Sequence, residues 1–477
     1  MVALTNPFRY LQRNADENPN GLFSRSADET VTNGEAVVLA KQIAYELRRL
    51  GVQPGQVVAL DLPDPLSILF TEAVYHEAAV STVIPDDYPT DGALRPDWVF
   101  SNRSPLPREG SRLVPVDARF LRRIEQNPSG ISPSDASIDT LRIVFSSGTT
   151  GTPKAMAMGA TMEKMMDAAS ASFFASAPNL TLMDTGTARG IGEFFLSVKT
   201  GQTYLCAGGL APAQVIRLAL RSSPKMLKGS PNQIAALVAE LDAQHLTLPS
   251  IETVIVSGTV MPAGVAERMR RAAEGCRIVG NYGSTEAGGA TSHDYESGDP
   301  FDAGHPVRGS EVEIVDDEGE AVPIGTVGRV RYRSPGMVHE YLGDPEATAR
   351  AFTDGWFYPG DLGFLRSDGG LTLAGRQSEL LNAGGVKIDP VRIDQFALQY
   401  PQVEDACSFD YATSTGIRQI GLALVADRDF DVHTLVADLE AEFGVAAPKL
   451  LARVDLIPRT VTGKPVRRTL AERYSED

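Results

Sequence analysis

A hydroxyl- and glycine-rich loop follows an apolar run at residues 143–154, IVFSSGTTGTPK. Such a loop exposes backbone N–H groups that bind an anion, and a lysine behind it adds a positive charge. The spacing is not that of a Walker loop, because Lys154 is followed by Ala155 rather than by a serine or threonine. We therefore predict a phosphate-binding loop of another kind, with a flexible surface turn as the alternative. The predicted nucleotide-binding residues are Ser146, Ser147, Gly148, Thr149, Thr150, Gly151 and Lys154.

Four further segments place polar residues where strands or turns are expected to end. They read NYGSTEAGG at 281–289, DGWFYPGDLG at 354–363, GRQSELLNAGGVKIDP at 375–390 and LIPRTVTGKPVRR at 456–468. With the first loop they resemble, in the same order, the motifs of the acyl-adenylate-forming superfamily. That superfamily includes acyl-CoA synthetases, adenylation domains of nonribosomal peptide synthetases and firefly luciferase. Five motifs in one order are far more specific than any one alone.

The segment 281–289 makes chemical sense as a nucleotide site. Tyr282 offers a flat ring face for adenine, Gly283 permits close approach, and Glu286 is a hard oxygen ligand for Mg²⁺. Taken alone, Tyr282 reads more readily as a packed strand-end aromatic, and Glu286 as a solvated loop charge. The resemblance implies catalytic roles for Glu286 and Thr149. It also implies nucleotide binding by Asn281, Tyr282, Gly283, Ser284 and Thr285.

Asp361 and Arg376 are the candidates for ribose binding. The Asp361 carboxylate can accept hydrogen bonds from both ribose hydroxyls, and Arg376 can donate to the sugar or to a phosphate. The alternatives are an Asx-turn and a salt bridge at the rim. The resemblance implies ribose binding at both positions. It also implies that Gly258 and Thr259 line the adenine, although Met261 stands where the family usually has a proline.

Lys464, in the sequence TGK, resembles the lysine that bridges the substrate carboxylate and the α-phosphate in this family. Two anions must meet there and a pentavalent phosphorus gains charge. A cation at that point stabilises the transition state more than the ground state. The alternative is an exposed lysine in the tail. The resemblance implies that Lys464 is the main catalytic residue and also binds the nucleotide.

The acyl-binding region departs from the family pattern. Gly186 stands where many coenzyme A ligases carry a histidine, and Ala188 where amino-acid-activating domains carry an aspartate. An α-amino acid substrate is therefore not expected. Arg189 suits a second carboxylate on the substrate, while a surface arginine is the commoner alternative. The predicted acyl-pocket residues are Gly186, Arg189, Gly229 and Gly288.

The segments between the motifs predict the elements that hold them. Thr32 and Glu35 stand at capping-box spacing before an amphipathic helix that ends at Gly51. Strand-like and helix-like segments alternate through 56–85 and again through 224–283, which predicts a largely parallel sheet covered by helices. From about residue 310, alternating sequence with glycine turns predicts antiparallel strands. The motifs that follow parallel strands are expected at the carboxyl edge, where such sheets bind ligands.

We predict an α/β fold of two domains. The large N-terminal domain, residues 1–376, is expected to hold mixed or parallel sheets flanked by helices plus a small antiparallel β unit, and to bind nucleotide and acyl group. The small mobile α+β C-terminal domain, residues 377–477, is expected to carry Lys464. Ser378 occupies the hinge position of the family, which usually holds Asp or Lys, and a small turn-compatible residue suits rotation.

The overall charge narrows the range of partners. The 477 residues include 44 Lys and Arg against 61 Asp and Glu, a net charge of −17, which argues against nucleic acid or an anionic membrane as partner. Three scattered cysteines indicate neither a disulfide framework nor a zinc site. The sequence lacks a run of about 18 apolar residues and a signal-peptide pattern, so a cytoplasmic protein without an integral membrane segment is expected. Nothing in the sequence specifies an oligomeric state.

The resemblance implies an ATP-dependent carboxylate–CoA ligase that uses Mg²⁺. A small carboxylic acid attacks the α-phosphate, pyrophosphate leaves, and the thiol of coenzyme A then displaces AMP. The alternative is a free-standing adenylation enzyme that passes the acyl group to the phosphopantetheine thiol of a carrier protein or to an amine. A non-catalytic nucleotide-binding relative is disfavoured, because the chain retains the residues such a relative could lose. These are Lys154, Glu286, Asp361, Arg376 and Lys464.

Overall fold

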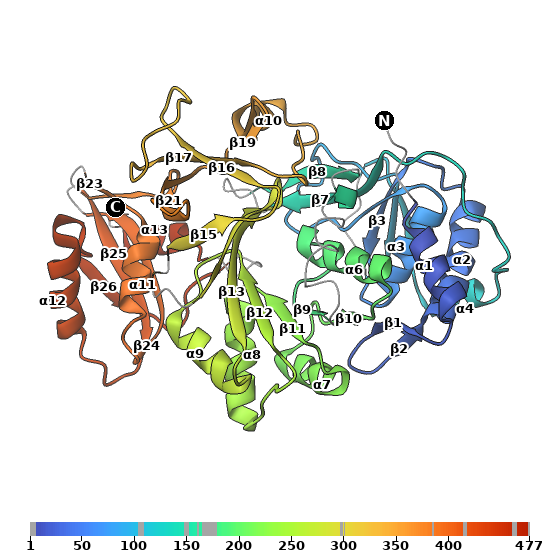
Figure 1. The fold of residues 1–477 in the computed structure, drawn as a ribbon, viewed down its shortest axis with the longest axis horizontal. Coiled ribbons are helices and arrows are strands. Elements are labelled where there is room, and N and C mark those ends of the chain that lie inside the picture. The colour runs from blue at the N-terminus through green and yellow to red at the C-terminus, as the bar shows by residue number, and fades with distance from the viewer. Residues whose placement is uncertain are drawn as a thin grey trace.

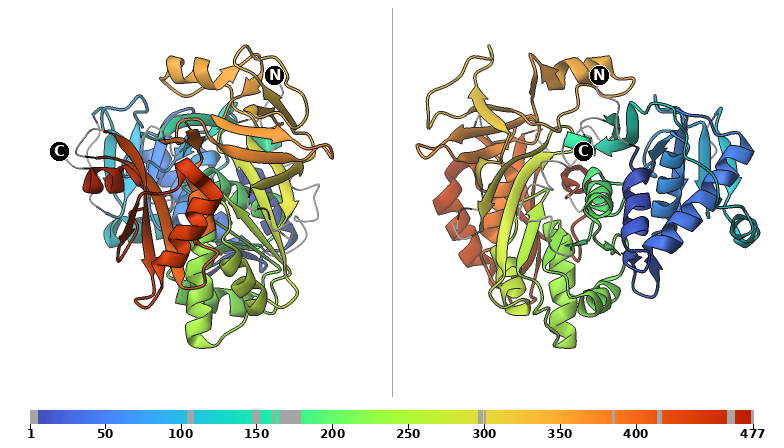
Figure 2. Two further views of the ribbon diagram at one scale, coloured as in Figure 1. Left: turned by 90° about the vertical axis from the view of Figure 1, so that its left-hand side faces the viewer. Right: turned by 45° about the vertical axis from the view of Figure 1, so that its right-hand side comes forward.

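The structure, a computed structural model, describes residues 6–103, 109–146, 152–159, 162–164, 179–295, 299, 301–383, 386–413, 417–459 and 465–475. Within these residues the strands form four sheets. The N-terminal (blue) and C-terminal (red) parts lie at opposite ends of the molecule, with the green and yellow segments between them (Figure 1, and the right-hand view of Figure 2). None of the helices in this part of the chain combines the length and apolar character that crossing a bilayer requires.

The N-terminal sheet has the strand order β6-β5-β3-β4-β7-β8. Neighbours from β6 to β7 run parallel, and β8 returns antiparallel to β7. The strands are β3 (Val57–Asp61), β4 (Val80–Thr82), β5 (Trp98–Ser101), β6 (Arg112–Pro115), β7 (Thr140–Ser146) and β8 (Lys154–Gly159). Ser146 at the end of β7 faces Lys154 at the start of β8. The sheet therefore fixes both ends of the predicted phosphate loop.

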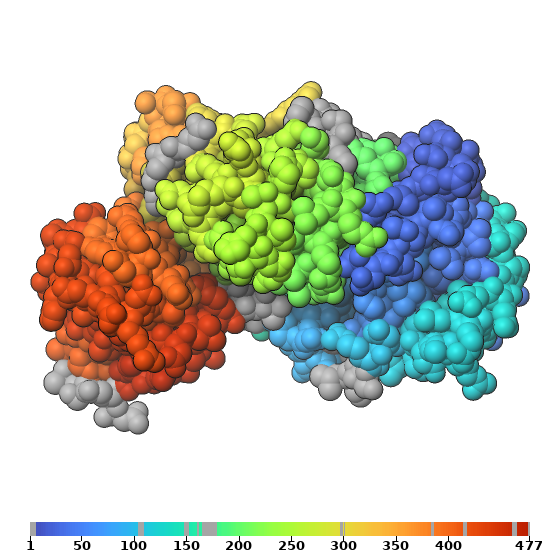
Figure 3. Space-filling view, turned by 90° about the horizontal axis from the view of Figure 1, so that it is seen from below, coloured from blue at the N-terminus to red at the C-terminus, as the bar shows by residue number. Residues whose placement is uncertain are grey.

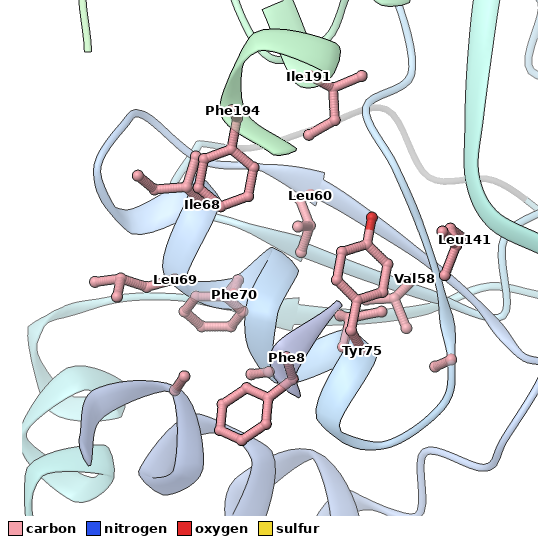
Figure 4. Packing of buried hydrophobic residues seen from close by; sticks show 14 of the residues in the cluster. Phe8, Val58, Leu60, Ile68, Leu69, Phe70, Tyr75, Leu141, Ile191 and Phe194 are labelled. Atoms are coloured by element: carbon pink, nitrogen blue, oxygen red, sulfur yellow. The ribbon is translucent and has the colours of Figure 1, made fainter. Parts of the chain in front are cut away.

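Helices cover this sheet and join it to the rest of the molecule. They are α1 (Phe8–Glu17), α2 (Asn33–Leu50), α3 (Leu66–His76) and α4 (Ala118–Glu125). The predicted capping box at the start of α2 is confirmed, because Thr32 and Glu35 each accept a hydrogen bond from the other's backbone amide. Figure 4 shows the apolar core on this side, with residues of α3 among those of β3, β7 and α6 (Ala188–Thr200). Burial of these side chains ties the sheet to α6.

In the part of the chain that the structure describes, the second sheet has 15 strands. Its first part is parallel in the order β13-β12-β11-β9-β10-β1, with β2 antiparallel at its edge. The strands are β1 (Leu22–Arg25), β2 (Thr30–Thr32), β9 (Asn179–Thr181), β10 (Tyr204–Cys206), β11 (Met226–Gly229), β12 (Thr253–Ser257) and β13 (Arg277–Ser284). The connecting helices after α6 are α7 (Pro212–Ser222), α8 (Pro231–Gln244) and α9 (Ala263–Ala272). This is the predicted alternation of strand and helix.

The rest of this sheet is antiparallel and follows the order β13-β14-β15-β21-β20-β17-β19-β18, with β16 on β17. The strands are β14 (Gly288–Asp294), β15 (Asp302–Pro306), β16 (Glu311–Val315), β17 (Gly328–Arg333), β18 (Phe352–Thr353), β19 (Trp356–Phe357), β20 (Asp361–Leu365) and β21 (Leu371–Arg376), and helix α10 spans Pro345–Ala351. Antiparallel pairing thus begins before residue 310, and it continues the main sheet because β15 bonds to both β14 and β21.

The strands after Arg376 form sheets of their own. In the described residues, β22 (Leu381–Ala383) pairs only with β23 (Val386–Ile388), and a three-stranded sheet joins β24 (Val403–Ala412), β25 (Arg418–Ala426) and β26 (Leu450–Arg453). The helices here are α11 (Pro390–Ala397), α12 (Val432–Phe443), the 3₁₀ turn Gly444–Ala446 and α13 (Arg467–Tyr474). Figure 3 shows this part as a lobe set off by an indentation. The predicted fold class is confirmed, while the domain limits and the mobility of the C-terminal domain stay predictions.

Candidate active site

A cleft of about 3160 Å³ brings together residues from the N-terminal sheet, the main sheet and the C-terminal part. The carboxyl ends of β11, β12 and β13 open into it, as expected for parallel strands. Four predicted site residues, Tyr282, Glu286, Asp361 and Arg376, line it together. The cleft therefore holds the candidate active site.

The two described ends of the phosphate loop face this cleft. The Ser146 side chain is buried, and its Oγ has no hydrogen-bond partner among the described residues. A buried hydroxyl without a partner is costly, so this one suits a ligand atom. Lys154 Nζ lies 4.7 Å from the centroid of the Tyr341 ring. The predicted ligands between them lie outside the described residues and stay predictions: Ser147, Gly148, Thr149, Thr150 and Gly151.

Glu286 is buried and hydrogen-bonded to the same tyrosine. The Tyr341 hydroxyl donates to Glu286 Oε1 at 2.9 Å, and burial together with the Glu286 charge raises the pKa of Tyr341. The backbone amide of Leu342 donates to the Ala155 carbonyl at 2.8 Å, which ties this segment to β8. Tyr341 thus joins the loop lysine to the predicted metal-binding carboxylate. The motifs did not reveal it, because its partners lie far away in the sequence.

Tyr282, Asp361 and Arg376 form one hydrogen-bonded group. The Tyr282 hydroxyl donates to Asp361 Oδ2 at 2.6 Å, and Arg376 Nε donates to Asp361 Oδ1 at 2.9 Å. Asp361 begins β20 directly opposite Arg376, the last residue of β21. Burial and the neighbouring Asp361 raise the pKa of Tyr282. Burial alone would lower the pKa of Arg376, but the Asp361 carboxylate outweighs this effect and the pKa of Arg376 is raised. The tyrosine therefore stays neutral and the arginine stays charged.

The backbone around these groups requires glycine at two places. A β carbon on Gly283 would lie 2.2 Å from the Gly288 carbonyl oxygen, so only glycine fits the β13–β14 hairpin there. Gly258 follows β12 with φ +101°, a left-handed conformation that favours glycine. Thr259 beside it is exposed, and Asn281 in β13 is half-buried; all four positions line the cleft or its wall.

Ser284 and Thr285 close the hairpin at the end of β13. Ser284 Oγ accepts a hydrogen bond from the Tyr332 hydroxyl at 2.8 Å, and Thr285 is half-buried in the turn. Burial raises the pKa of Tyr332, which remains a donor. Both predicted residues line the cleft, and Tyr332 of β17 is a second supporting tyrosine that the motifs did not indicate.

The predicted acyl-pocket residues lie along α6, β11 and the start of β14. Gly186 precedes α6 and donates its amide to Asp184 Oδ1 at 2.8 Å, and Arg189 lies in the first turn of α6. Gly229 ends β11, and Gly288, with φ +66°, begins β14. All except Gly229 line the cleft.

Sequence reasoning missed a buried ion pair in the same region. Lys228 Nζ lies 2.7 Å from Glu193 Oε1 and 2.8 Å from Oε2, and both residues line the cleft. Lys228 is the penultimate residue of β11, a central parallel strand that usually carries apolar side chains. A lysine at that position was the signal that could have found the pair.

Two further predicted residues, the hinge and the catalytic lysine, belong to the C-terminal part of the sequence. Ser378 is exposed in the turn that follows β21. Lys464 lies outside the described residues, so its role stays a prediction. The described residues on either side are anchored by ion pairs: Arg459 to Asp405 at 2.6 Å, and Arg467 Nη2 to Asp394 Oδ2 at 2.7 Å.

Comparison with known proteins agrees with this geometry. Residues 117–342 match the family model of AMP-binding enzymes. Feruloyl-CoA synthase from Amycolatopsis sp is 25% identical, covering 97% of this chain and 98% of the relative. The anthranilate CoA ligase AuaEII in complex with anthranoyl-AMP superimposes with a TM-score of 0.86 at 21% identity, over 100% of this chain and 98% of that one. The amide bond synthetase McbA from Marinactinospora thermotolerans gives a TM-score of 0.80 at 21% identity, over 98% and 100% of the two chains.

At such identities the two solved structures establish the fold alone. The chain therefore carries a domain that matches AMP-binding enzymes over residues 117–342, and over nearly its whole length it is similar to an acyl-CoA synthase.

Proposed function

We propose that this protein is an AMP-forming ligase that activates a small carboxylic acid with ATP and transfers the acyl group to coenzyme A. The observation that carries the proposal is that two groups of contacting side chains lie in one cleft. One is Tyr282 with Asp361 and Arg376, suited to a nucleoside; the other is Glu286 with Tyr341 and Lys154, suited to phosphates.

The nucleoside group holds adenosine by stacking and by charge-assisted hydrogen bonds. Each Asp361 oxygen already accepts one hydrogen bond, from Tyr282 or from Arg376, and each keeps a further lone pair. Ribose hydroxyls donate to these lone pairs, while the Tyr282 hydroxyl and Arg376 keep the carboxylate in place. Hydrogen bonds to an ionised acceptor are the stronger kind.

The phosphate group places a cation and an unpartnered hydroxyl beside a carboxylate. Lys154 and Ser146 Oγ bind phosphate oxygens, and Tyr341 holds the Glu286 carboxylate toward the cleft. No cluster of three His, Cys, Asp or Glu side chains exists among the described residues. Glu286 would hold a bound Mg²⁺, since carboxylate oxygens suit this ion. The ion would neutralise phosphate charge.

Two displacements complete the reaction. A carboxylate oxygen of the acid attacks the α-phosphorus, the bond to the β-phosphate breaks, and pyrophosphate leaves. The sulfur of the thiol then attacks the acyl carbonyl carbon, the thiol loses its proton, and AMP leaves with the oxygen. Lys464 stabilises the charge that develops in the first displacement. Coenzyme A is the proposed thiol, since the full-length relative is named for a CoA thioester.

A second candidate keeps the first displacement and changes the acceptor. The fold is shared with an amide bond synthetase, so an amine, or the phosphopantetheine thiol of a carrier protein, is the alternative nucleophile. The acid-dependent step is common to both candidates.

Acid-dependent exchange of pyrophosphate into ATP tests the proposal. We expect exchange with at least one acid of a broad panel, and formation of an acyl-CoA thioester, seen by mass spectrometry, when coenzyme A is added. Exchange without a thioester, but with an amide or a loaded carrier protein, selects the second candidate. ATP binding without exchange for any acid would refute both.

A further inference from the structure

Three charged side chains meet on one wall of the cleft, where α6 lies against β11. They are Arg189 and Glu193 of α6 and Lys228 of β11, and all three line the cleft. Acyl pockets are mostly apolar with few polar groups. A wall with three charges therefore restricts the kind of acid that fits.

The Lys228–Glu193 pair is buried and satisfied. The side chains are only 5% and 12% exposed, and the lysine ammonium group lies within 2.8 Å of both carboxylate oxygens. Lysine and glutamate are rarely buried unless they are paired in this way. The two charges cancel, so the pair leaves no net charge on the wall.

Arg189 makes no comparable contact. It is half-buried, and no hydrogen bond or ion pair to another described residue satisfies its guanidinium group. Burial lowers its pKa, and the Glu193 charge only partly offsets this effect. It also lies in the first turn of α6, where the helix dipole disfavours a cation and favours an anion. The Arg189 guanidinium group therefore lacks a directly paired carboxylate among the described residues.

The neighbouring charges do not supply one. Behind this wall Arg142 is fully buried, donates to the Thr185 carbonyl at 2.6 Å, and lies within the field of Asp64 and Asp184. Burial, followed by repulsion from Asp184, raises the pKa of Asp64 to about 7. Arg142 is thus already engaged with this group, and Arg189 stands at the cleft wall without a hydrogen-bonded or ion-paired carboxylate among the described residues.

We infer that the acid activated here carries a second carboxylate, and that Arg189 binds this second carboxylate while the Lys228–Glu193 pair holds α6 and β11 in register around it. The inference rests on the proposed function. A planar guanidinium group binds a carboxylate through two parallel hydrogen bonds, a geometry that a neutral ester or an alkyl end cannot match. The substrate class is thus a dicarboxylic acid.

Matched pairs of acids give the direct test. Pyrophosphate exchange is measured with malonic, succinic, glutaric, adipic and terephthalic acids, each beside its monomethyl ester, which has a similar shape without the second charge. We expect at least one diacid to exceed its ester in kcat/KM by roughly ten- to a hundredfold, the worth of a hydrogen-bonded charge.

A charge series then assigns the preference to these residues. Arg189→Gln and Lys228→Met each remove one positive charge and should bring the ratio of diacid to ester close to one. Glu193→Gln adds net positive charge and should keep or increase the ratio. The double variant Glu193→Gln/Lys228→Met has the wild-type net charge. It should therefore keep most of the preference for the diacid over its ester. Arg119→Gln, on an exposed residue of α4 outside the cleft, makes the same chemical change as a control.

The ratio within one variant is insensitive to the fraction of folded enzyme, so misfolding does not imitate the expected result. The inference is overturned if monoesters or simple monocarboxylic acids serve at least as well as every diacid, a result that leaves the proposed ligase function intact. It is also overturned if Arg189→Gln lowers exchange with diacid and ester in equal proportion. No exchange with any acid would overturn the proposed function, and this inference with it.

Discussion

Glu72 is a carboxylic acid in the interior of α3 whose two side-chain oxygens have no hydrogen-bond partner among the described residues. Burial raises its pKa from 4.5 to about 8. The folded protein therefore keeps a proton at neutral pH that the unfolded chain has lost. Stability must fall as the pH rises between these two values, by up to about 1.4 kcal/mol per pH unit.

Replacing Glu72 by glutamine should flatten this pH dependence. Because Glu72→Gln removes the titrating group, we expect its melting temperature to fall less than that of the wild type between about pH 5 and about pH 9. Differential scanning fluorimetry across the range measures this. Glu267→Gln, an exposed position on α9, makes the same change without burial and should follow the wild type. Parallel profiles for wild type and Glu72→Gln would contradict the assignment.

Lys464 carries the largest expected catalytic effect of one residue. We expect Lys464→Ala to lower acid-dependent pyrophosphate exchange by roughly 10²–10³-fold, the range for removing one preorganised charge-stabilising donor. Transfer from preformed acyl-AMP to the thiol should be much less affected, because that step gains no charge on phosphorus. Lys449→Ala, an exposed lysine of the same C-terminal part, serves as the control. Near-normal pyrophosphate exchange in Lys464→Ala would contradict this catalytic role.

At the scale of elements, the β13–β14 hairpin decides where the nucleotide groups stand. It holds Tyr282 on one strand and brings the backbone of Gly288 against Gly283, leaving no room for a side chain. From the sequence, Gly283 is expected to permit close approach of the adenine. The structure adds a packing reason, since the hairpin itself needs the missing β carbon.

Two alanine substitutions in this hairpin should therefore differ. Gly283→Ala places its β carbon 2.2 Å from a backbone oxygen and should destabilise the protein by roughly 1–3 kcal/mol, as overpacking does, and raise the KM for ATP. Gly289→Ala meets only Val307 Cγ2, at 3.7 Å, an ordinary contact, and should stay close to wild type. Urea denaturation and ATP titration compare them, and equal behaviour of the two variants would refute the packing argument.

At the scale of the whole molecule, the cleft is built by parts on both sides of Ser378. The strands before it belong to the main sheet and those after it form separate sheets. Ser378 is exposed, and the backbone hydrogen bonds of the described turn use the amides of Gln377 and Glu379 rather than its own. A proline at 378 thus removes no backbone hydrogen bond of the described turn while restricting φ.

Ser378→Pro should separate the two half-reactions if the C-terminal part turns about this position. We expect the ratio of adenylation rate to thioester-forming rate to change by on the order of tenfold, the effect of about 1.4 kcal/mol on one of two poses. Single-turnover assays of each half-reaction measure it. Ser378→Ala, which keeps φ free, is the control. An equal fall in both rates for Ser378→Pro would argue against the hinge.

The sequence by itself determined the fold class, the capped helix after Thr32 and the grouping of Tyr282, Asp361 and Arg376 in one site. Capping depends on residues three apart, and strand and helix periods are local, so both can be read from the chain. The three site residues were assigned through the resemblance of their motifs and through their chemistry. The structure then brought them within hydrogen-bonding distance.

Only the tertiary structure decided which distant side chains meet. Tyr341 bonds to Glu286 across 55 positions, and Lys228 pairs with Glu193 across 35. No local pattern encodes these contacts, because they depend on the order in which strands join the sheet and on which helix packs against which strand. The burial of Arg189 has the same origin, since desolvation is a property of the assembled wall and not of the segment that contributes the arginine.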